Sequence, residues 1–101
     1  MQNKIKNSFY HILLLPLISA LVLGQEISGV VKNKNGTPLA GANINVEGSN
    51  KGAAAGVDGT FSFQYDLSKD FTIAVSYIGY QTLRKSFSTN DVITNLQFTL
   101  V

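Results

Sequence analysis

The sequence predicts an all-β sandwich, and two observations lead to this prediction. Seven short segments after residue 26 have the alternating apolar and polar residues, or the small-residue extended composition, of β-strands. Turn-forming residues separate these segments at intervals of about 8 to 12 residues, and nothing after residue 24 has the period of a helix. The predicted strands are residues 27–32, 42–47, 53–56, 60–65, 71–77, 81–87 and 94–101.

The first two predicted strands are joined by a segment rich in turn residues. In residues 27–32 the isoleucine, glycine and second valine share one face. Residues 33–38 contain the Asn-Gly pair and the proline that favour a turn, and we expect Leu39 to fold back onto the core. Residues 42–47 alternate most regularly, with alanine, isoleucine and valine against two asparagines and a glutamate, which predicts one buried and one wet face.

The middle of the chain predicts a weak strand followed by a strong one. Residues 48–52 have turn composition, and residues 53–56 contain only alanine and glycine, so we expect a short edge strand or an extended loop there. An Asp-Gly turn of the hairpin type follows at residues 57–59. Residues 60–65 place three aromatic residues on one face, and residues 66–70 are expected to form a polar loop or a single helical turn.

The C-terminal part of the chain predicts three further strands. Residues 71–77 carry phenylalanine, isoleucine, valine and tyrosine at alternate positions, and the glycine within residues 78–80 predicts a bend or a bulge. Residues 81–87 place a leucine and a phenylalanine on one face and an arginine on the other. After a turn at residues 88–91, residues 94–101 alternate again and complete the predicted sheet structure.

Aromatic residues are expected to supply much of the core, because a single core in so short a chain contributes only a few kcal/mol of net stability. Burial of a phenylalanine side chain contributes about 1.5–3 kcal/mol of transfer free energy. The aromatic residues predicted to point inward are Phe61, Phe63, Tyr65, Phe71, Phe87 and Phe98.

Residues 1–24 have the three parts of a secretory signal peptide. Two lysines make the first part basic, residues 12–24 are uncharged and mainly apolar, and small residues precede a cleavage site before Gln25. The alternative is a membrane anchor, but the uncharged run has 13 residues, whereas about 20 are needed to span a bilayer. The sequence therefore predicts a signal peptide at residues 1–24, a β-sandwich domain at residues 25–101, and no membrane span in the mature chain.

The predicted mature chain lacks the residues that most catalytic and metal sites require. The sequence has no cysteine, and its one histidine, His11, lies in the predicted signal peptide. Residues 25–101 therefore cannot form a Ser-His-Asp triad, a Cys-His pair or a zinc site with histidine or cysteine ligands. Their six basic and six acidic residues balance, which gives no evidence for nucleic-acid binding. We expect a protein that is not an enzyme and has no cofactor, metal ion or catalytic residue.

Spaced glycine, asparagine, aliphatic and aromatic residues run in a recognisable order through residues 26–101. They are Ile27, Gly29, Val31, Asn35, Gly36, Pro38, Leu39, Gly41, Ala42, Ile44, Val46, Gly48, Ser49, Gly52, Asp58, Gly59, Phe61, Val75, Ser76, Tyr77, Ile78, Gly79 and Tyr80. This set resembles the carboxypeptidase-regulatory-like domain. The version with the Val-Ser-Tyr-Ile-Gly-Tyr segment is similar to the N-terminal extension of TonB-dependent outer-membrane receptors of the SusC type in Bacteroidota. The chain departs from the family at Ala55 and Gly56, where the family often has threonine or serine followed by aspartate.

The resemblance implies a seven-stranded, transthyretin-like Greek-key sandwich that is exported to the periplasm or outer membrane. It implies a non-catalytic accessory domain in TonB-dependent uptake of glycans or other nutrients, with protein partners among the transport components of the cell envelope. The chain would be either a stand-alone domain or the N-terminal part of a longer receptor. The alternative function is a stand-alone periplasmic or surface module that binds carbohydrate or protein, so a glycan is a second candidate ligand.

Three residues are candidates for contact with a partner: Tyr77, Tyr80 and Arg84. The two tyrosines flank the predicted bend, where they either contact a partner or glycan or pack within the fold, and packing is the simpler interpretation. Arg84 and Lys85 are adjacent on a strand and therefore point to opposite faces, which is typical of edge charges rather than of an anion site.

Two further patterns are interpreted as structural. Asp58, Asp66 and Asp70 lack the spacing of a calcium loop, and we expect them to be solvated acids in turns. The glycines of the predicted turns are not followed by a helix start and a lysine, as a phosphate-binding loop requires.

Overall fold

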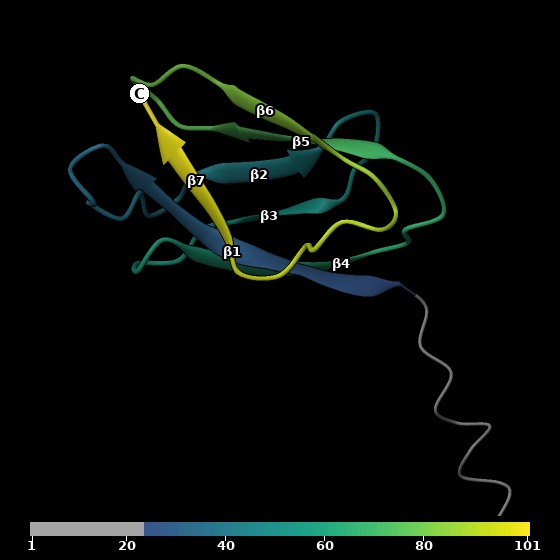
Figure 1. The fold of residues 1–101 in the computed structure, drawn as a ribbon. Coiled ribbons are helices and arrows are strands. Elements are labelled where there is room, and N and C mark those ends of the chain that lie inside the picture. Colours follow the sequence, from purple (N-terminus) through teal and green to yellow (C-terminus); the bar gives the residue numbers. More distant parts are fainter. Residues whose placement is uncertain (1–23) are drawn as a thin grey trace, which may run out of the picture.

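Seven strands form two β-sheets that lie face to face (Figure 1). The strands are β1 (Gln25–Asn33), β2 (Asn43–Val46), β3 (Gly52–Ala54), β4 (Thr60–Tyr65), β5 (Phe71–Ser76), β6 (Leu83–Phe87) and β7 (Leu96–Leu100). This computed structural model describes residues 24–101, and none of these residues is helical. The described part of the chain accordingly offers no helix that could cross a membrane. The predicted signal peptide, with His11, lies outside the described residues except for Gly24.

β1 is the central strand of a three-stranded sheet with the order β4-β1-β7, and the second sheet has the order β3-β2-β5-β6. β1 pairs antiparallel with β4, with Gln25 opposite Tyr65, and parallel with β7, with Gly29 opposite Leu96. All strand pairs of the four-stranded sheet are antiparallel. The predicted seven-stranded, all-β sandwich is therefore confirmed.

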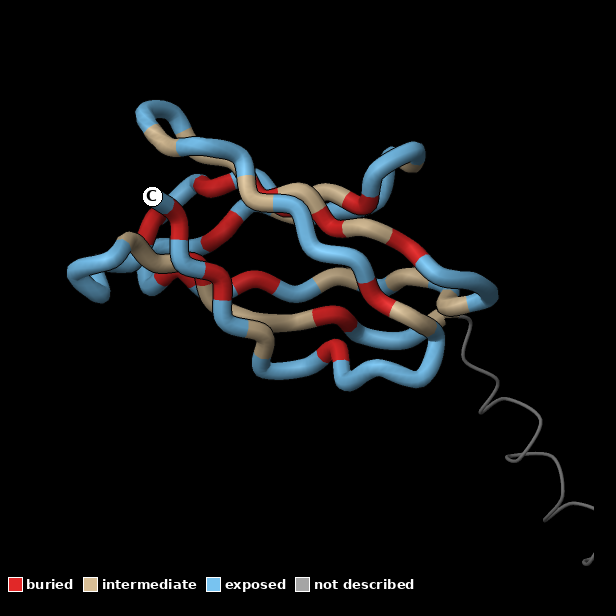
Figure 2. Tube along the Cα trace, turned by 45° about the horizontal axis from the view of Figure 1, so that its top comes forward, coloured by how far each residue is buried: buried red, intermediate tan, exposed pale blue. Residues whose placement is uncertain are grey.

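The apolar faces of the strands meet between the two sheets. Buried residues recur along the strands between exposed and half-buried ones, as the red segments of the tube show (Figure 2). The buried residues are Ile27, Val31, Leu39, Ala42, Ile44, Val46, Ala55, Phe61, Phe71, Ile73, Val75, Phe87, Ile93, Phe98 and Leu100. Leu39 thus folds back into the core from the segment that precedes β2, as its position after the proline turn predicts.

The six predicted inward-facing aromatic residues all contribute to this core. Four phenylalanines are buried, and the aromatic residues at the two later inward positions of β4 are partly buried against them. The ring centroids of Phe61 and Phe98 are 6.0 Å apart, and those of Phe71 and Phe87 are 5.5 Å apart. Such contacts contribute about 0.5–1.5 kcal/mol beyond the burial of the rings, so each sheet has its own stabilising aromatic pair.

Two glycines allow backbone segments to approach each other closely. A Cβ atom on Gly29 would overlap the carbonyl oxygen of Leu96, so glycine at this position lets the start of β7 lie against β1. Gly59 has a φ angle of 81°, and a Cβ atom there would lie 2.5 Å from the carbonyl oxygen of Val31. The backbone N–H of Val31 donates to the carbonyl of Gly59 at 2.8 Å, which fastens the turn before β4 to β1.

The turn at residues 57–59 has a different role from the one that its hairpin composition predicts. The backbone N–H of Gly56 donates to the carbonyl of Thr60 at 2.8 Å, as in a closed hairpin. The strands that flank the turn, β3 and β4, nevertheless belong to different sheets, so the turn carries the chain across the sandwich. Residues 66–70 form a loop without a helical turn, and β3 is the short edge strand that the alanine-rich composition predicts.

Candidate interaction surface

The two predicted contact residues Tyr77 and Tyr80 brace the turn between β5 and β6. Gly79 has a φ angle of 90°, and the backbone N–H of Tyr80 donates to the carbonyl of Tyr77 at 3.0 Å. The two rings lie 5.9 Å apart at an angle of 47°, and both are half-buried against the core. The hydroxyl of Tyr80 accepts a hydrogen bond from Nδ2 of Asn33 at 3.3 Å. The tyrosines therefore hold the turn to the sandwich, with only part of each ring accessible to a partner.

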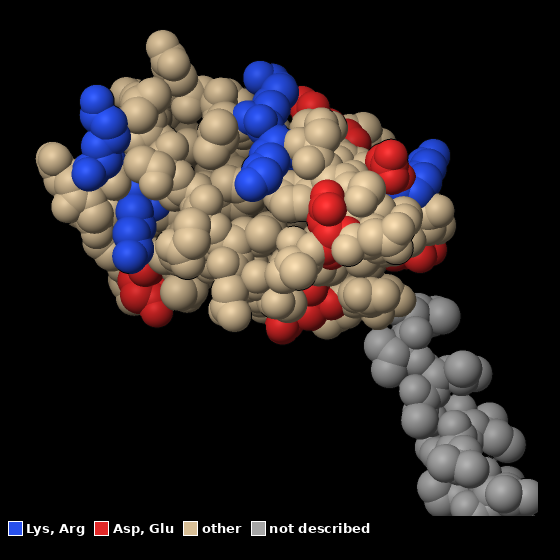
Figure 3. Space-filling view, viewed as in Figure 1, with Lys and Arg blue, Asp and Glu red and all other residues tan. Residues whose placement is uncertain are grey.

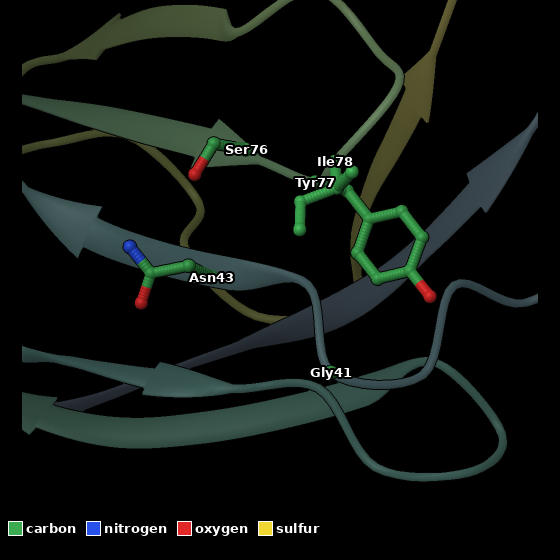
Figure 4. A pocket seen from close by; sticks show the side chains of 5 residues that line it. All are labelled: Gly41, Asn43, Ser76, Tyr77 and Ile78. Atoms are coloured by element: carbon green, nitrogen blue, oxygen red, sulfur yellow. The ribbon is translucent and has the colours of Figure 1, made fainter.

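A shallow hollow lies on the side of this turn where β2 begins. It has a volume of about 600 Å³ and is lined by Gly41, Asn43, Ser76, Tyr77 and Ile78. Asn43 and Ser76 are register partners on β2 and β5, and their side chains project beside each other (Figure 4). The lining has no charged side chain, so it offers an amide, a hydroxyl and an apolar side chain to a neutral polar ligand.

Ile78 is a further contact residue, which the sequence pattern alone did not indicate. It is 94% exposed at the tip of the turn, whereas most large aliphatic residues of the described chain are buried. The sequence does contain a sign of this role, because the tip of a tight turn normally carries a polar residue. Here it carries an isoleucine next to a glycine. Ile78 thus adds an apolar contact to the hollow that a partner can cover.

Arg84, the third predicted contact residue, is held by a neighbouring side chain. Its Nε atom donates to Oε2 of Glu47 at 2.8 Å, and the two side chains are 60% and 41% exposed. Lys85 lies on the opposite face of β6, with Nζ 5.6 Å from the centre of the Phe87 ring. The structure therefore brings Tyr77 and Tyr80 together but pairs Arg84 with Glu47, and the three residues do not form one site.

The aspartates interpreted as turn acids lie in exposed turns and loops. Asp58 Oδ1 accepts a hydrogen bond from the Thr60 hydroxyl at 2.6 Å and another from the Thr60 backbone N–H at 3.1 Å. These bonds, the hydroxyl first, lower the pKa of Asp58 below its ordinary value because they stabilise the carboxylate. Between residues 24 and 101 no three histidine, cysteine or acidic side chains gather in a way that would hold a metal ion.

Comparison with known proteins places the chain in a family. The sequence model of the CarboxypepD_reg-like domain matches residues 27–101. The chain is 35% identical over 83 residues to the TonB-dependent receptor SusC of Bacteroides thetaiotaomicron, a match that covers 75% of this chain and 8% of that receptor. The chain thus spans less than a tenth of the length of this relative.

Two solved structures share the fold at low sequence identity. A chain of an N-terminal interface mutant of a type II cohesin–X-dockerin complex from Acetivibrio cellulolyticus matches with a TM-score of 0.61 and 17% identity, over 76% of this chain and 57% of that chain. The C-terminal interface mutant of this complex matches with a TM-score of 0.50 and 19% identity, over 75% and 52%. The family match covers every strand except the first two residues of β1, and the protein belongs to the CarboxypepD_reg-like domain family.

Proposed function

We infer that this protein is an exported, non-catalytic accessory domain of TonB-dependent nutrient or glycan uptake at the outer membrane. The observation that carries this proposal is the 35% identity to the receptor SusC, together with the family match over residues 27–101. The composition agrees with a binding rather than a chemical role, because residues 25–101 contain neither histidine nor cysteine. The domain would act in the periplasm by contact with protein components of the transport machinery.

Cell fractionation and N-terminal sequencing test the export part of the proposal. Removal of the signal peptide at residues 1–24 predicts a mature protein that begins with Gln25 and is found in the periplasmic or outer-membrane fraction. A full-length protein that keeps Met1 and stays in the cytoplasm contradicts export. The coding DNA that follows codon 101 tests the receptor part, because a receptor predicts a TonB box, a plug and a barrel there.

Deletion of codons 27–101 from the chromosome tests the uptake part of the proposal. The expected result is slower growth on a polysaccharide that the parent strain takes up by TonB-dependent transport, with unchanged growth on glucose. Complementation with the wild-type gene controls for effects of the deletion on adjacent genes. Equal growth of the deletion strain and its parent on every such polysaccharide contradicts a role in uptake.

A second candidate function is binding of a neutral glycan, and the hollow beside the β5–β6 turn favours it. Asn43, Ser76 and Tyr77 offer the amide and hydroxyl groups that hydrogen-bond to sugar hydroxyls, and Ile78 offers an apolar contact. Titration of the purified protein against a panel of glycans tests this function. Saturable binding that is lost in Asn43→Ala supports it, and this variant is preferable to Tyr80→Ala because Asn43 is exposed and Tyr80 packs against the core.

A further inference from the structure

The edges of the two sheets differ in what protects them from the addition of another strand. In the four-stranded sheet, β3 has only three residues and β6 carries Arg84 and Lys85. Short length and charge are two features by which edge strands resist pairing with another chain. In the three-stranded sheet, the edge strands β4 and β7 contain no charged residue and no proline. The unprotected edges therefore belong to the three-stranded sheet.

The backbone of β7 has hydrogen-bonding groups on its outer edge that no part of residues 24–101 uses. The N–H of Val31 points toward Gly59 and β4, so Val30 and Lys32 of β1 face β7. In the parallel register, these two residues bond to Leu96, Phe98 and Leu100. The N–H and C=O groups of the alternate residues Gln97 and Thr99 therefore point outward.

The side chains and the neighbours of Gln97 and Thr99 leave this edge accessible. Both residues are exposed, and β7 lies at the front of the sandwich, where β1 is its only neighbour among the strands of residues 24–101 (Figure 1). Val101 follows Gln97 and Thr99 at the same two-residue spacing, and its carbonyl accepts a hydrogen bond from the backbone N–H of Gln81 at 2.8 Å. This bond agrees with backbone groups at residues 97, 99 and 101 that point away from β1. It also marks the C-terminal limit of the open edge.

Basic side chains stand on both sides of this edge. Lys32 lies opposite Thr99 on β1, and Lys34 follows in the turn after β1. Lys85 is exposed on the face of β6 that is turned toward the three-stranded sheet, between Leu83 and Phe87. In the view of Figure 3, basic side chains lie on the half of the surface that holds the C-terminus and near its middle, with another at the far end, whereas acidic residues lie mainly on that far half. The charge around β7 therefore complements an acidic partner.

The outer edge of β4 is partly used already and has the opposite charge around it. The N–H of Gly56 already donates to the carbonyl of Thr60 on that edge, and β3 lies close to β4. Asp58 and Asp66 stand just before and just after the strand, so an acidic segment would be repelled at both ends. Of the two unprotected edges, β7 is the one that combines free backbone groups with a favourable charge.

We propose that the outer edge of β7 is a strand-acceptor site for an extended acidic segment of a partner protein. The added strand would bond to the backbone of Gln97 and Thr99. Its side chains would point alternately to the two faces of the sheet. Those on the core side would lie near Leu96 and Lys85, and those on the outer side near Lys32. The inference rests on the proposed function in one respect, since it names the site through which an accessory domain of this kind contacts its protein partner.

A titration of the purified protein followed by NMR amide shifts tests the site. The probe is a blocked peptide of alternating valine and threonine with a glutamate at each end, and its control is the same peptide with lysine in place of glutamate. The acidic peptide is expected to shift and protect the amides of Gln97 and Thr99, and the lysine peptide to bind at least about threefold more weakly. Equal binding of the two peptides, binding at β4, or no binding at either edge overturns the proposal.

Two sets of variants locate the interaction. Lys32→Glu combined with Lys85→Glu is expected to weaken binding of the acidic peptide by about 3- to 30-fold, because two charge attractions become repulsions. The matched control, Lys51→Glu combined with Lys69→Glu, changes the net charge equally at turns beyond the other end of the sandwich and should leave binding unchanged. An effect of the control pair as large as that of the Lys32 and Lys85 pair, or larger, contradicts the assignment to β7.

Thr99→Pro tests the backbone contact separately from charge. Proline removes the outward N–H of residue 99 but no hydrogen bond within the sheet, so the fold is expected to persist while peptide binding falls at least about fivefold. Unchanged binding in a folded Thr99→Pro variant overturns the proposed backbone pairing. If this variant does not fold, the lysine variants alone decide whether the peptide binds at β7. These measurements use purified protein, so their failure is distinguishable from a failure of the export and deletion experiments.

Discussion

The two sides of the sandwich are built differently. On one side β3 lies close to β4, and the turn at residues 57–59 crosses between the sheets and is fastened to β1 by the bond from Val31 to Gly59. On the other side, the bond from Gln81 to Val101 joins the residue two positions before β6 to the residue after β7. The segment 88–95 connects the two strands and contributes Ile93 to the core. We conclude that the first side closes the fold and that the second leaves a strand edge available for a partner.

The largest expected effect on stability comes from removing an aromatic residue of the core, to which both sides of the sandwich contribute. Phe61→Ala on β4 and Phe87→Ala on β6 should each lower the free energy of unfolding by about 3–5 kcal/mol, because each leaves a cavity between packed rings. Denaturant unfolding of the two variants measures this loss. A cost below about 1 kcal/mol for Phe87→Ala alone would show that the β6 side does not belong to the same core.

The next largest effect should be confined to the closed side. Gly59→Ala combines a left-handed backbone conformation with a Cβ atom 2.5 Å from the carbonyl oxygen of Val31, so we expect a loss of about 2–4 kcal/mol. Gly36→Ala is the matched control, because Gly36 has a φ angle of 85° but open space around a Cβ atom, and its loss should be about 1–2 kcal/mol. Thermal unfolding compares them, and equal losses would contradict the close approach at Gly59.

A smaller, pH-dependent effect is also expected from the closed side. Because hydrogen bonds from Thr60 hold the folded-state pKa of Asp58 below its ordinary value, the ionised carboxylate stabilises the folded protein. This stabilisation is present above the unfolded-state pKa and is lost as the pH falls through the folded-state pKa, on the acid side of about pH 4. Unfolding curves across this range should show a reduced acid loss in both Asp58→Asn and Thr60→Val. An undiminished loss in Thr60→Val would contradict the assigned cause.

The smallest expected effect is that of the exposed ion pair on the four-stranded sheet. A double-mutant cycle of Glu47→Ala and Arg84→Ala should give a coupling of about 0.2–1 kcal/mol that decreases as salt is added, because both side chains are largely in water. Arg84→Ala should also leave binding of the acidic peptide to β7 unchanged, since its side chain is turned to the outer face of the other sheet. A large loss of peptide binding would show that the acceptor edge is β6.

The sequence predicts the faces of the strands better than their neighbours. Alternation within residues 42–47 or 71–77 determines which side chains are buried, because successive residues point to opposite faces. Alternation does not determine which strand lies alongside, so the parallel pairing of β1 with β7 and the crossing of the chain at residues 57–59 appear only in the structure.

In the candidate site too, contacts between residues close in the sequence are predictable, whereas contacts between distant residues are not. Tyr77 and Tyr80 could be grouped from the sequence because a single turn joins them. The pairing of Arg84 with Glu47 joins residues 37 positions apart, and no local pattern encodes it. The outer edge of β7 could not be found from its composition either, because whether a strand is central or at an edge depends on the order of strands in the sheet.

Amide hydrogen exchange of the purified protein without a partner shows whether the outer edge of β7 is open. If the outer edge of β7 is open, the amides of Gln97 and Thr99 exchange rapidly, whereas those of Phe98 and Leu100, which are bonded to β1, are strongly protected. We expect this alternating pattern of protection within the single strand β7. Protection of Gln97 and Thr99 equal to that of Phe98 and Leu100 would contradict it, because the edge would then already be covered.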